Sequence, residues 1–283
     1  MATATRGKGD VSVLYSPAVA LDFFKVAGKK ENFAQGKVIF AEHDKARPYL
    51  FMRDKMYLLL DGEVDLVAGR KVIGTVAKGG IFGEMASITG APRTASAVAK
   101  SACRVIAVDD KQFRAGLEKQ PAFALMLMSM MVGRLRETIA KLAERTRIGK
   151  DAILEASAAV DPKRLAELAE GLASDPPEHY DRGRNIVEEG QTGLRMYAVL
   201  EGIVTVSVGG SAVERLGPGG VFGELALLEK SQRLASVHAE TDCEVLPINR
   251  TAFLLLVKTN SEFAASLLGT LAERLRILTA RLK

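Results

Sequence analysis

The pattern of apolar and polar positions gives the chain a β-rich character interrupted by longer helical stretches. Strict alternation over residues 204–208 (Val-Thr-Val-Ser-Val) places the valines on one face of a predicted strand. Short apolar runs in the first half predict further strands at 37–40, 56–60, 64–67 and 103–108. These strands are short and closely spaced, which is typical of a small antiparallel sheet protein.

Turn and helix signals separate these runs. Asp61-Gly62, between two predicted strands, predicts a hairpin turn. Residues 11–29 predict a short helix with Pro17 near its start, and helical spacing resumes at Phe113 and continues past Leu142. The predicted final helix carries one apolar stripe: Phe263, Leu267, Leu271, Leu275, Leu278 and Leu282.

The chain contains an internal repeat at an offset of 140 residues. The offset holds without a gap over residues 56–143, where 27 of 88 positions are identical to their counterparts. It pairs Cys103 with Cys243, and Arg134-Leu135-Arg136 with Arg274-Leu275-Arg276. A solenoid would need shorter and more numerous units, so the repeat indicates two homologous domains.

Each repeat combines strands with helices at both ends, which predicts a mainly β fold with flanking helices, an antiparallel barrel or jelly roll. We expect a flexible N-terminus at 1–10, a first domain at 11–145, a helical linker at 146–160 and a second domain at 161–283. Within the last of these, Asp161-Pro162 predicts the N-terminus of a helix.

Composition narrows the class of protein. Charged residues make up 26% of the chain and apolar residues 48%, and the formal net charge is only +5. These values predict a globular protein for which nucleic-acid binding is not expected. The two cysteines occupy equivalent positions in separate domains, so no disulfide is expected. No signal peptide or membrane-spanning run is visible, and the three histidines lack metal spacing, which favours a cytoplasmic protein without a metal or a membrane contact.

A motif of 14 residues occurs once in each repeat, from Phe82 to Ala95 and from Phe222 to Ala235. In both copies glycines precede a Glu, an Arg follows nine positions later, and small residues come after the Arg. Backbone N–H groups at a loop-to-helix turn bind phosphate oxygens, and a guanidinium pairs with them bidentately. A carboxylate only accepts hydrogen bonds, which suits a ribose hydroxyl. The motif therefore predicts two sites for a small phosphorylated anion.

These residues allow two other interpretations. Glu84 and Arg93 alone could form a structural ion pair, but their duplication beside glycines favours a nucleotide pocket. The run from Gly217 to Gly223 resembles a dinucleotide fingerprint, yet only about two helical turns fit before Arg233, too few for a crossover helix. No nucleophile–base arrangement is present, so we do not expect an enzyme.

With these features together, the chain resembles a tandem pair of cyclic nucleotide-binding domains. This family includes bacterial catabolite-activator-type regulators, kinase regulatory subunits and nucleotide-gated channels. The resemblance rests on Phe-Gly-Glu, the Arg followed by small residues, the preceding Gly-Gly and the helix after the motif, and it spans about residue 20 to 283. It implies a double-stranded β-helix, a jelly-roll-like fold, in each copy.

The resemblance also implies the ligand contacts. Glu84 and Gly83 would bind the ribose, and Arg93 with the backbone at Thr94-Ala95 would bind the cyclic phosphate. The candidate residues of the first copy are Phe82, Gly83, Glu84, Met85, Ala86, Arg93, Thr94 and Ala95. Those of the second are Phe222, Gly223, Glu224, Leu225, Ala226, Arg233, Leu234 and Ala235.

Two positions distinguish the copies. Gln232 and Leu234 depart from the family pattern, so the second site is expected to be weaker or differently selective. Thr138 is the polar member of the apolar seam of the first closing helix, and we expect it to contact the base. The alternative is a Thr that bonds to its own helix backbone.

The expected function is a stand-alone cyclic nucleotide receptor that signals to an effector protein by movement of its closing helix. The chain stops at Lys283 without a helix-turn-helix, and neither a kinase domain nor a pseudosubstrate segment is visible. Cyclic AMP is preferred as the ligand because it is the commoner bacterial messenger, and cyclic GMP stays open. Two alternatives are an interaction protein with degenerate pockets and a DNA-associated regulator acting through its basic linker. The apolar seams could pair in a homodimer or within one chain.

Overall fold

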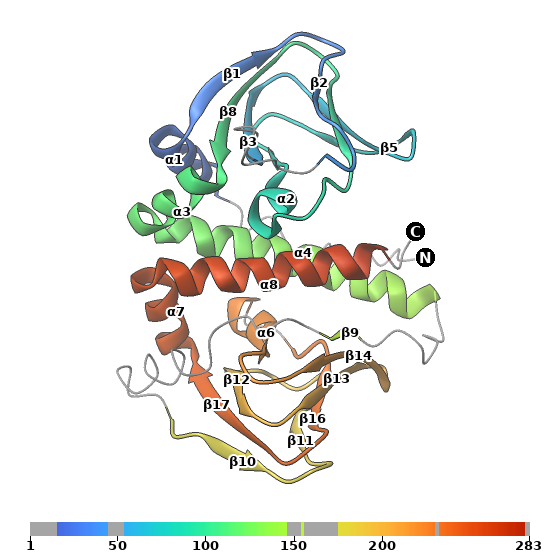
Figure 1. The fold of residues 1–283 in the computed structure, drawn as a ribbon, viewed down its shortest axis with the longest axis vertical. Coiled ribbons are helices and arrows are strands. Elements are labelled where there is room, and N and C mark those ends of the chain that lie inside the picture. The colour runs from blue at the N-terminus through green and yellow to red at the C-terminus, as the bar shows by residue number, and fades with distance from the viewer. Residues whose placement is uncertain (1–15, 45–53, 146–153, 156–174, 230–231, 281–283) are drawn as a thin grey trace, which may run out of the picture.

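The computed structural model describes residues 16–44, 54–145, 154–155, 175–229 and 232–280. Two β-rolls lie on opposite sides of a central layer formed by two long helices (Figure 1). The predicted N-terminal tail lies outside the described residues, as do the Asp161-Pro162 helix start and most of the predicted linker.

The first roll consists of two antiparallel sheets, with the described strands in the orders β1-β8-β3-β6 and β2-β7-β4-β5. The strands are β1 (Lys29–Phe33), β2 (Val38–Phe40), β3 (Lys55–Asp61), β4 (Val64–Ala68), β5 (Lys71–Val76), β6 (Ile81–Phe82), β7 (Ser96–Ala99) and β8 (Cys103–Asp109). Leu59, Val64 and Val105 are fully buried between the two sheets. Each strand directs its apolar positions inward because the side chains of the two inner faces form the core between the sheets.

The second roll repeats this topology, with the described strands in the orders β10-β17-β12-β15 and β11-β16-β13-β14-β9. The strands are β9 (Leu154–Glu155), β10 (Glu178–Tyr180), β11 (Asn185–Val187), β12 (Arg195–Glu201), β13 (Val204–Val208), β14 (Ser211–Leu216), β15 (Val221–Phe222), β16 (Ser236–Ala239) and β17 (Cys243–Asn249). The mainly β fold with flanking helices, repeated in tandem, is confirmed.

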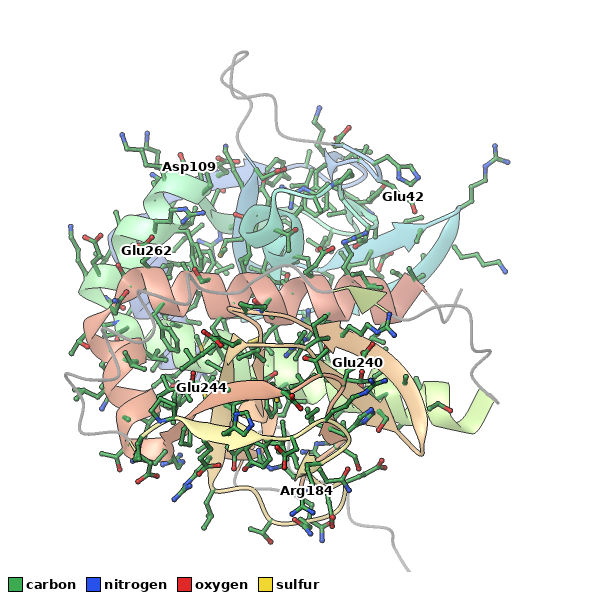
Figure 2. The ribbon with its side chains drawn as sticks, turned by 60° about the horizontal axis from the view of Figure 1, so that its bottom comes forward. Glu42, Asp109, Arg184, Glu240, Glu244 and Glu262 are labelled. Atoms are coloured by element: carbon green, nitrogen blue, oxygen red, sulfur yellow. The ribbon has the colours of Figure 1, made fainter. Side chains whose placement is uncertain are left out.

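The helices follow the same repeat. They are α1 (Pro17–Ala27), α2 (Glu84–Thr89), α3 (Asp110–Lys119), α4 (Pro121–Arg145), α6 (Glu224–Glu229), α7 (Arg250–Thr259) and α8 (Ser261–Ala280). Helix α1 lies within the range predicted for it, 11–29, and begins at Pro17 because Ser16 caps it and Pro17 occupies its first position. The side chain of Asp109 caps α3 by accepting from the Gln112 N–H (Figure 2).

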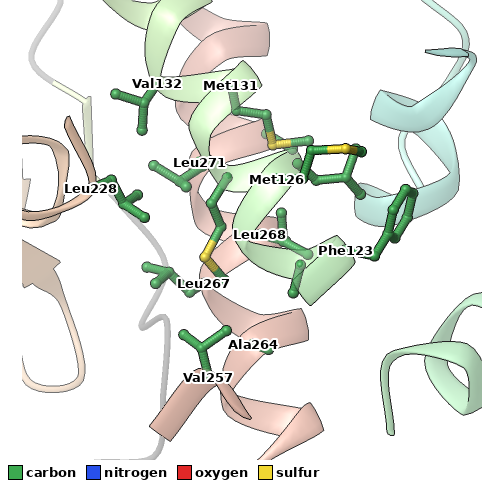
Figure 3. Packing of buried hydrophobic residues seen from close by; sticks show 14 of the residues in the cluster. Phe123, Met126, Met131, Val132, Leu228, Val257, Ala264, Leu267, Leu268 and Leu271 are labelled. Atoms are coloured by element: carbon green, nitrogen blue, oxygen red, sulfur yellow. The ribbon is translucent and has the colours of Figure 1, made fainter. Parts of the chain in front are cut away.

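Helices α4 and α8 pack side by side within the chain and join the two rolls into one core (Figure 3). Met131 and Val132 of α4 lie in the same buried cluster as Leu267 and Leu271 of α8. In addition, α8 packs against α2 of the first roll, and α4 packs against α6 of the second through Leu228. The apolar seams predicted from the sequence therefore pair within one chain.

The hairpin predicted at Asp61-Gly62 is wrong. Strands β3 and β4 belong to different sheets, so the turn is a corner at which the chain passes from one sheet to the other. Gly62 has a φ of +90°, and a Cβ atom there would lie 2.4 Å from the carbonyl oxygen of Ala102. The glycine is required by this close approach and by its positive φ.

Two helical predictions also need correction. The long helix predicted from Phe113 is broken at Gln120, because the ring of Pro121 disfavours helical geometry in the residue before it. The predicted helical linker is described only at Leu154–Glu155, where it forms β9 instead. There it pairs in parallel with β14, whose edge offers unpaired backbone groups.

Charged side chains cover the outer faces of both rolls, with Glu42 on the first and Arg184 and Glu240 on the second (Figure 2). The cysteines, Cys103 and Cys243, are buried and free, as the repeat predicts. None of the described helices combines the length and apolar character needed to span a bilayer.

Candidate functional site

Each motif begins with a glycine in the left-handed conformation. Gly83 has a φ of +76° and precedes α2, and Gly223 has a φ of +82° and precedes α6. A Cβ atom on Gly83 would lie 2.9 Å from Nη1 of Arg93, and one on Gly223 would lie 2.5 Å from Nη1 of Arg233. Glycine is therefore needed both for its backbone angle and for the approach of the guanidinium.

The guanidinium of Arg93 is buried against the motif backbone. It donates to the carbonyl oxygens of Gly83 at 2.7 Å and of Lys55 at 2.8 Å, and it lies 4.2 Å above the centre of the Phe40 ring. Asp54 forms an ion pair with it at 3.3 Å. Burial lowers the pKa of Arg93 from its ordinary value, and Asp54 opposes that shift. These contacts fix the position of a cation beneath the motif loop.

Arg233 repeats this geometry in the second roll. It donates to the carbonyl oxygens of Gly223 at 2.7 Å and of Arg195 at 2.5 Å. The two copies differ at the neighbouring carboxylate, because the repeat places the exposed Leu194 where the first copy has Asp54. Arg93 thus has an acidic partner in Asp54, whereas Leu194 offers Arg233 no carboxylate at the equivalent position.

The glutamate of the first motif is paired with an arginine of the closing helix. Glu84 is 4% exposed, and its Oε1 accepts from Nη1 of Arg134 on α4. Glu84 raises the pKa of Arg134, against the effect of burial. This contact links the motif directly to α4. The alternative of a simple Glu84–Arg93 pair is not what the geometry shows, since the two side chains have different nearest partners.

The second motif has a larger buried cluster. Arg274 of α8 donates from Nη1 to Glu224 at 2.6 Å, from Nε to Glu214 at 3.0 Å and from Nη2 to the Val221 carbonyl at 2.6 Å. Burial alone would lower the pKa of Arg274, but Glu214 and Glu224 outweigh it and raise the pKa. Position 74, the counterpart of Glu214 in the first copy, is a glycine. Arg274 therefore attaches α8 to the second roll more firmly than Arg134 attaches α4 to the first roll.

A cavity lies at each motif, about 200 Å³ in the first roll and about 90 Å³ in the second. All eight candidate residues of the first motif and all eight of the second line their cavities. Thr138 does not belong to the lining of the first cavity described here. Its hydroxyl donates to the Arg134 carbonyl at 2.8 Å, so its contact with a base stays a prediction.

Sequence reasoning missed several residues of the sites. The repeat pairs Arg134 with Arg274, and this identity between the copies is the signal that could have identified both. Asp54 and Glu214 gave no such signal because their counterparts differ. Ile139 of α4 lines the second cavity, and only the packing of the two long helices reveals this.

Comparison with known proteins agrees with this geometry. The sequence profile described as the cyclic nucleotide-binding domain matches residues 30–120 and 177–260, which cover both motifs and most of both rolls. The chain belongs to this family. In this cyclic nucleotide-binding protein, the described residues contain no group of three His, Cys, Asp or Glu side chains arranged for a metal ion.

Individual relatives span different parts of this cyclic nucleotide-binding chain. The cAMP-dependent protein kinase regulatory subunit of Eremothecium gossypii is 28% identical over 210 residues, which are 72% of this chain and 40% of that protein. The chain thus spans well under half of this curated relative.

Solved structures are also similar to this chain. The regulatory domain of Toxoplasma gondii PKA with cAMP is 21% identical, covering 99% of this chain and 100% of that one, with a TM-score of 0.32. The Thermus thermophilus catabolite activator protein is 29% identical over 44% of this chain and 62% of that one, with a TM-score of 0.39.

Proposed function

We propose that this protein is a cyclic nucleotide receptor that regulates a protein partner. The observation that carries the proposal is the duplicated geometry: a buried guanidinium and a buried carboxylate line each cavity, within the two segments that match the family. Arg93 and Arg233 would bind the cyclic phosphate, and Glu84 and Glu224 would accept from the ribose hydroxyl. Cyclic AMP is the preferred ligand in this proposal, and cyclic GMP is the second choice.

The anchoring arginine can bind phosphate without leaving its present partners. A guanidinium carries five N–H groups, and Arg93 donates one to each of two carbonyl oxygens. A phosphate would bring two charge-assisted hydrogen bonds of about 1.5–3 kcal/mol each. In the first site the phosphate competes with Asp54, whereas in the second site it meets Arg233 beside the uncharged Leu194.

The closing helices supply the output. A ribose hydroxyl that donates to Glu84 shares the carboxylate with Arg134, so the ligand changes how α4 is held to the first roll. Helix α4 also packs on α6 and α8, which carry this change to the second roll. We infer that α4 has two positions and that the ligand raises the population of the one to which it binds more tightly. The difference between the two affinities sets the size of the shift. A regulated protein partner would bind one of these arrangements.

Calorimetric titration with cyclic AMP, cyclic GMP and, as a control, 5′-AMP tests the proposal. We expect two sites for a cyclic nucleotide and much weaker binding of 5′-AMP, whose phosphate carries an additional charge and is not held in a ring. At about 100 times the dissociation constant, the ligand should also stabilise the fold by roughly 2.7 kcal/mol. No binding heat and no thermal shift with either cyclic nucleotide would refute the proposal and favour degenerate pockets.

A further inference from the structure

The second cavity is lined from both halves of the chain. Leu135 and Ile139 of α4, which belong to the first repeat, lie in its lining together with Leu278 of α8. In the first cavity, the lining residues described all come from the first repeat, Arg134 of α4 included. The two sites are therefore not equivalent: the second depends on a helix that follows the first roll.

The charged side chains that line the second cavity already have a proposed ligand contact or a hydrogen-bond partner in the protein. Arg233 is the phosphate anchor of the proposed function, on which this inference rests, and Glu224 is the ribose acceptor. Glu214 also lines the cavity, but its Oε1 accepts from Nε of Arg274 at 3.0 Å. Arg274 lines the cavity as well, and its guanidinium donates to Glu224, Glu214 and the Val221 carbonyl. Apart from the motif and these two charged side chains, the lining is aliphatic: Leu135, Ile139, Val187, Val206, Val208, Val213, Val237 and Leu278. A base must therefore lie against aliphatic side chains.

We propose that Leu135 and Ile139 form part of the base-binding wall of the second site, and that this site binds purines through their faces with little discrimination between adenine and guanine. An aliphatic wall excludes water from the base but cannot hydrogen-bond its edge. Such pockets distinguish related ligands by only about 10- to 200-fold, whereas sites with matched hydrogen bonds reach factors of about 10⁴.

The repeat supports this difference between the sites. Thr138 in the first closing helix corresponds to Leu278 in the second, so the second helix lacks the hydroxyl at that position. Ile139 corresponds to Thr279 of α8, which is exposed. Part of the apolar lining of the second site thus comes from α4, at a position where the equivalent residue of α8 is a polar surface residue.

The test uses the full chain carrying Arg93→Ala, in which the second site is the one that retains its phosphate anchor. Calorimetric titration should give dissociation constants for cyclic AMP and cyclic GMP that differ by less than about 200-fold, the upper limit for an aliphatic pocket. Adding Ile139→Ala should raise both about tenfold, because it removes apolar contact with the base. The milder Ile139→Val, which is too small a change to unfold the protein, should raise both about threefold.

Two controls make the result specific to the second site. Thr279→Ala, the matched position on α8, should leave both dissociation constants unchanged. In a chain carrying Arg233→Ala, which keeps the first site, Ile139→Ala should change affinity by less than about twofold. Unchanged second-site affinity in both Ile139 variants, or a preference between the two nucleotides above about 200-fold, would overturn the inference. Absence of binding in the unaltered chain would instead refute the proposed function itself.

Discussion

The buried cluster around Arg274 allows a quantitative test of how the second closing helix is held in place. Glu214 is 7% exposed, and its carboxylate lies 3.0 Å from Nε of Arg274. Glu214→Gln keeps the size of the side chain and one acceptor oxygen but removes the charge. Arg274 would then keep only Glu224 as an ionised partner, an arrangement similar to that of the first site.

The structure bounds the size of the effect. Removing one partner of a buried ion pair costs about 3–5 kcal/mol when the other charge is left alone. Here Arg274 retains Glu224 at 2.6 Å and the Val221 carbonyl at 2.6 Å, so the full cost does not apply. The remaining loss is the difference between a charge-assisted and a neutral hydrogen bond. We therefore expect Glu214→Gln to lower the free energy of unfolding by about 1–2 kcal/mol.

Urea unfolding followed by far-ultraviolet circular dichroism measures this difference, since the chain contains no tryptophan for fluorescence. Glu240→Gln is the matched control, at the residue that directly follows β16 of the same sheet. Glu240 pairs with Arg215 at 2.8 Å, but the two side chains are 31% and 42% exposed. An exposed pair of this kind contributes only about 0–1 kcal/mol, so the control should change the free energy of unfolding by less than about 0.5 kcal/mol.

A Glu214→Gln protein as stable as the unaltered chain would refute this reasoning. It would mean that the cost of removing Glu214 from water cancels its attraction to Arg274, which is a known outcome for buried pairs. Equal losses in Glu214→Gln and Glu240→Gln would also contradict it, because burial would then have no influence on the strength of the pair.

Three further predictions concern ligand binding and are checked by calorimetric titration. Arg93→Ala should weaken the first site by roughly 3–5 kcal/mol, and Arg233→Ala the second site by a similar amount, because each leaves the phosphate unpaired; unchanged affinity would contradict the assigned role. Asp54→Asn should strengthen the first site by about 1–2 kcal/mol, since it removes a negative charge that lies 3.3 Å from the anchoring guanidinium; weaker binding would show that Asp54 mainly positions Arg93. Thr138→Ala should lower first-site affinity by about 1 kcal/mol and change the purine preference; if neither changes, the hydroxyl serves only the Arg134 carbonyl.

The sequence predicted the parts of the fold that depend on local pattern and on the repeat. The strands around Leu59 and Val105 lie where short apolar runs predict them, and α1 begins at Pro17, which the sequence places near the start of a helix. The motif residues line the cavities because their spacing is a local property. The corner at Gly62 could not be predicted, because a turn that joins two sheets and a hairpin turn use the same residues. Only pairing with distant strands decides between them.

The same limit explains why the two sites differ more than their motifs do. Gly83 and Gly223 and the two anchoring arginines match between the copies, since each guanidinium donates to main-chain carbonyls that both copies supply whatever the side chains. The unmatched residues, Asp54, Glu214 and Ile139, act where the motif meets another element: a neighbouring strand, the closing helix or the other repeat. A duplicated sequence can keep its local geometry while these contacts diverge. In the first site a carboxylate competes for the anchoring guanidinium, and the described contacts give the arginine of the closing helix one glutamate, not two. The first site should therefore respond to ligand with the larger movement, and the second should mainly hold the α4–α8 layer together.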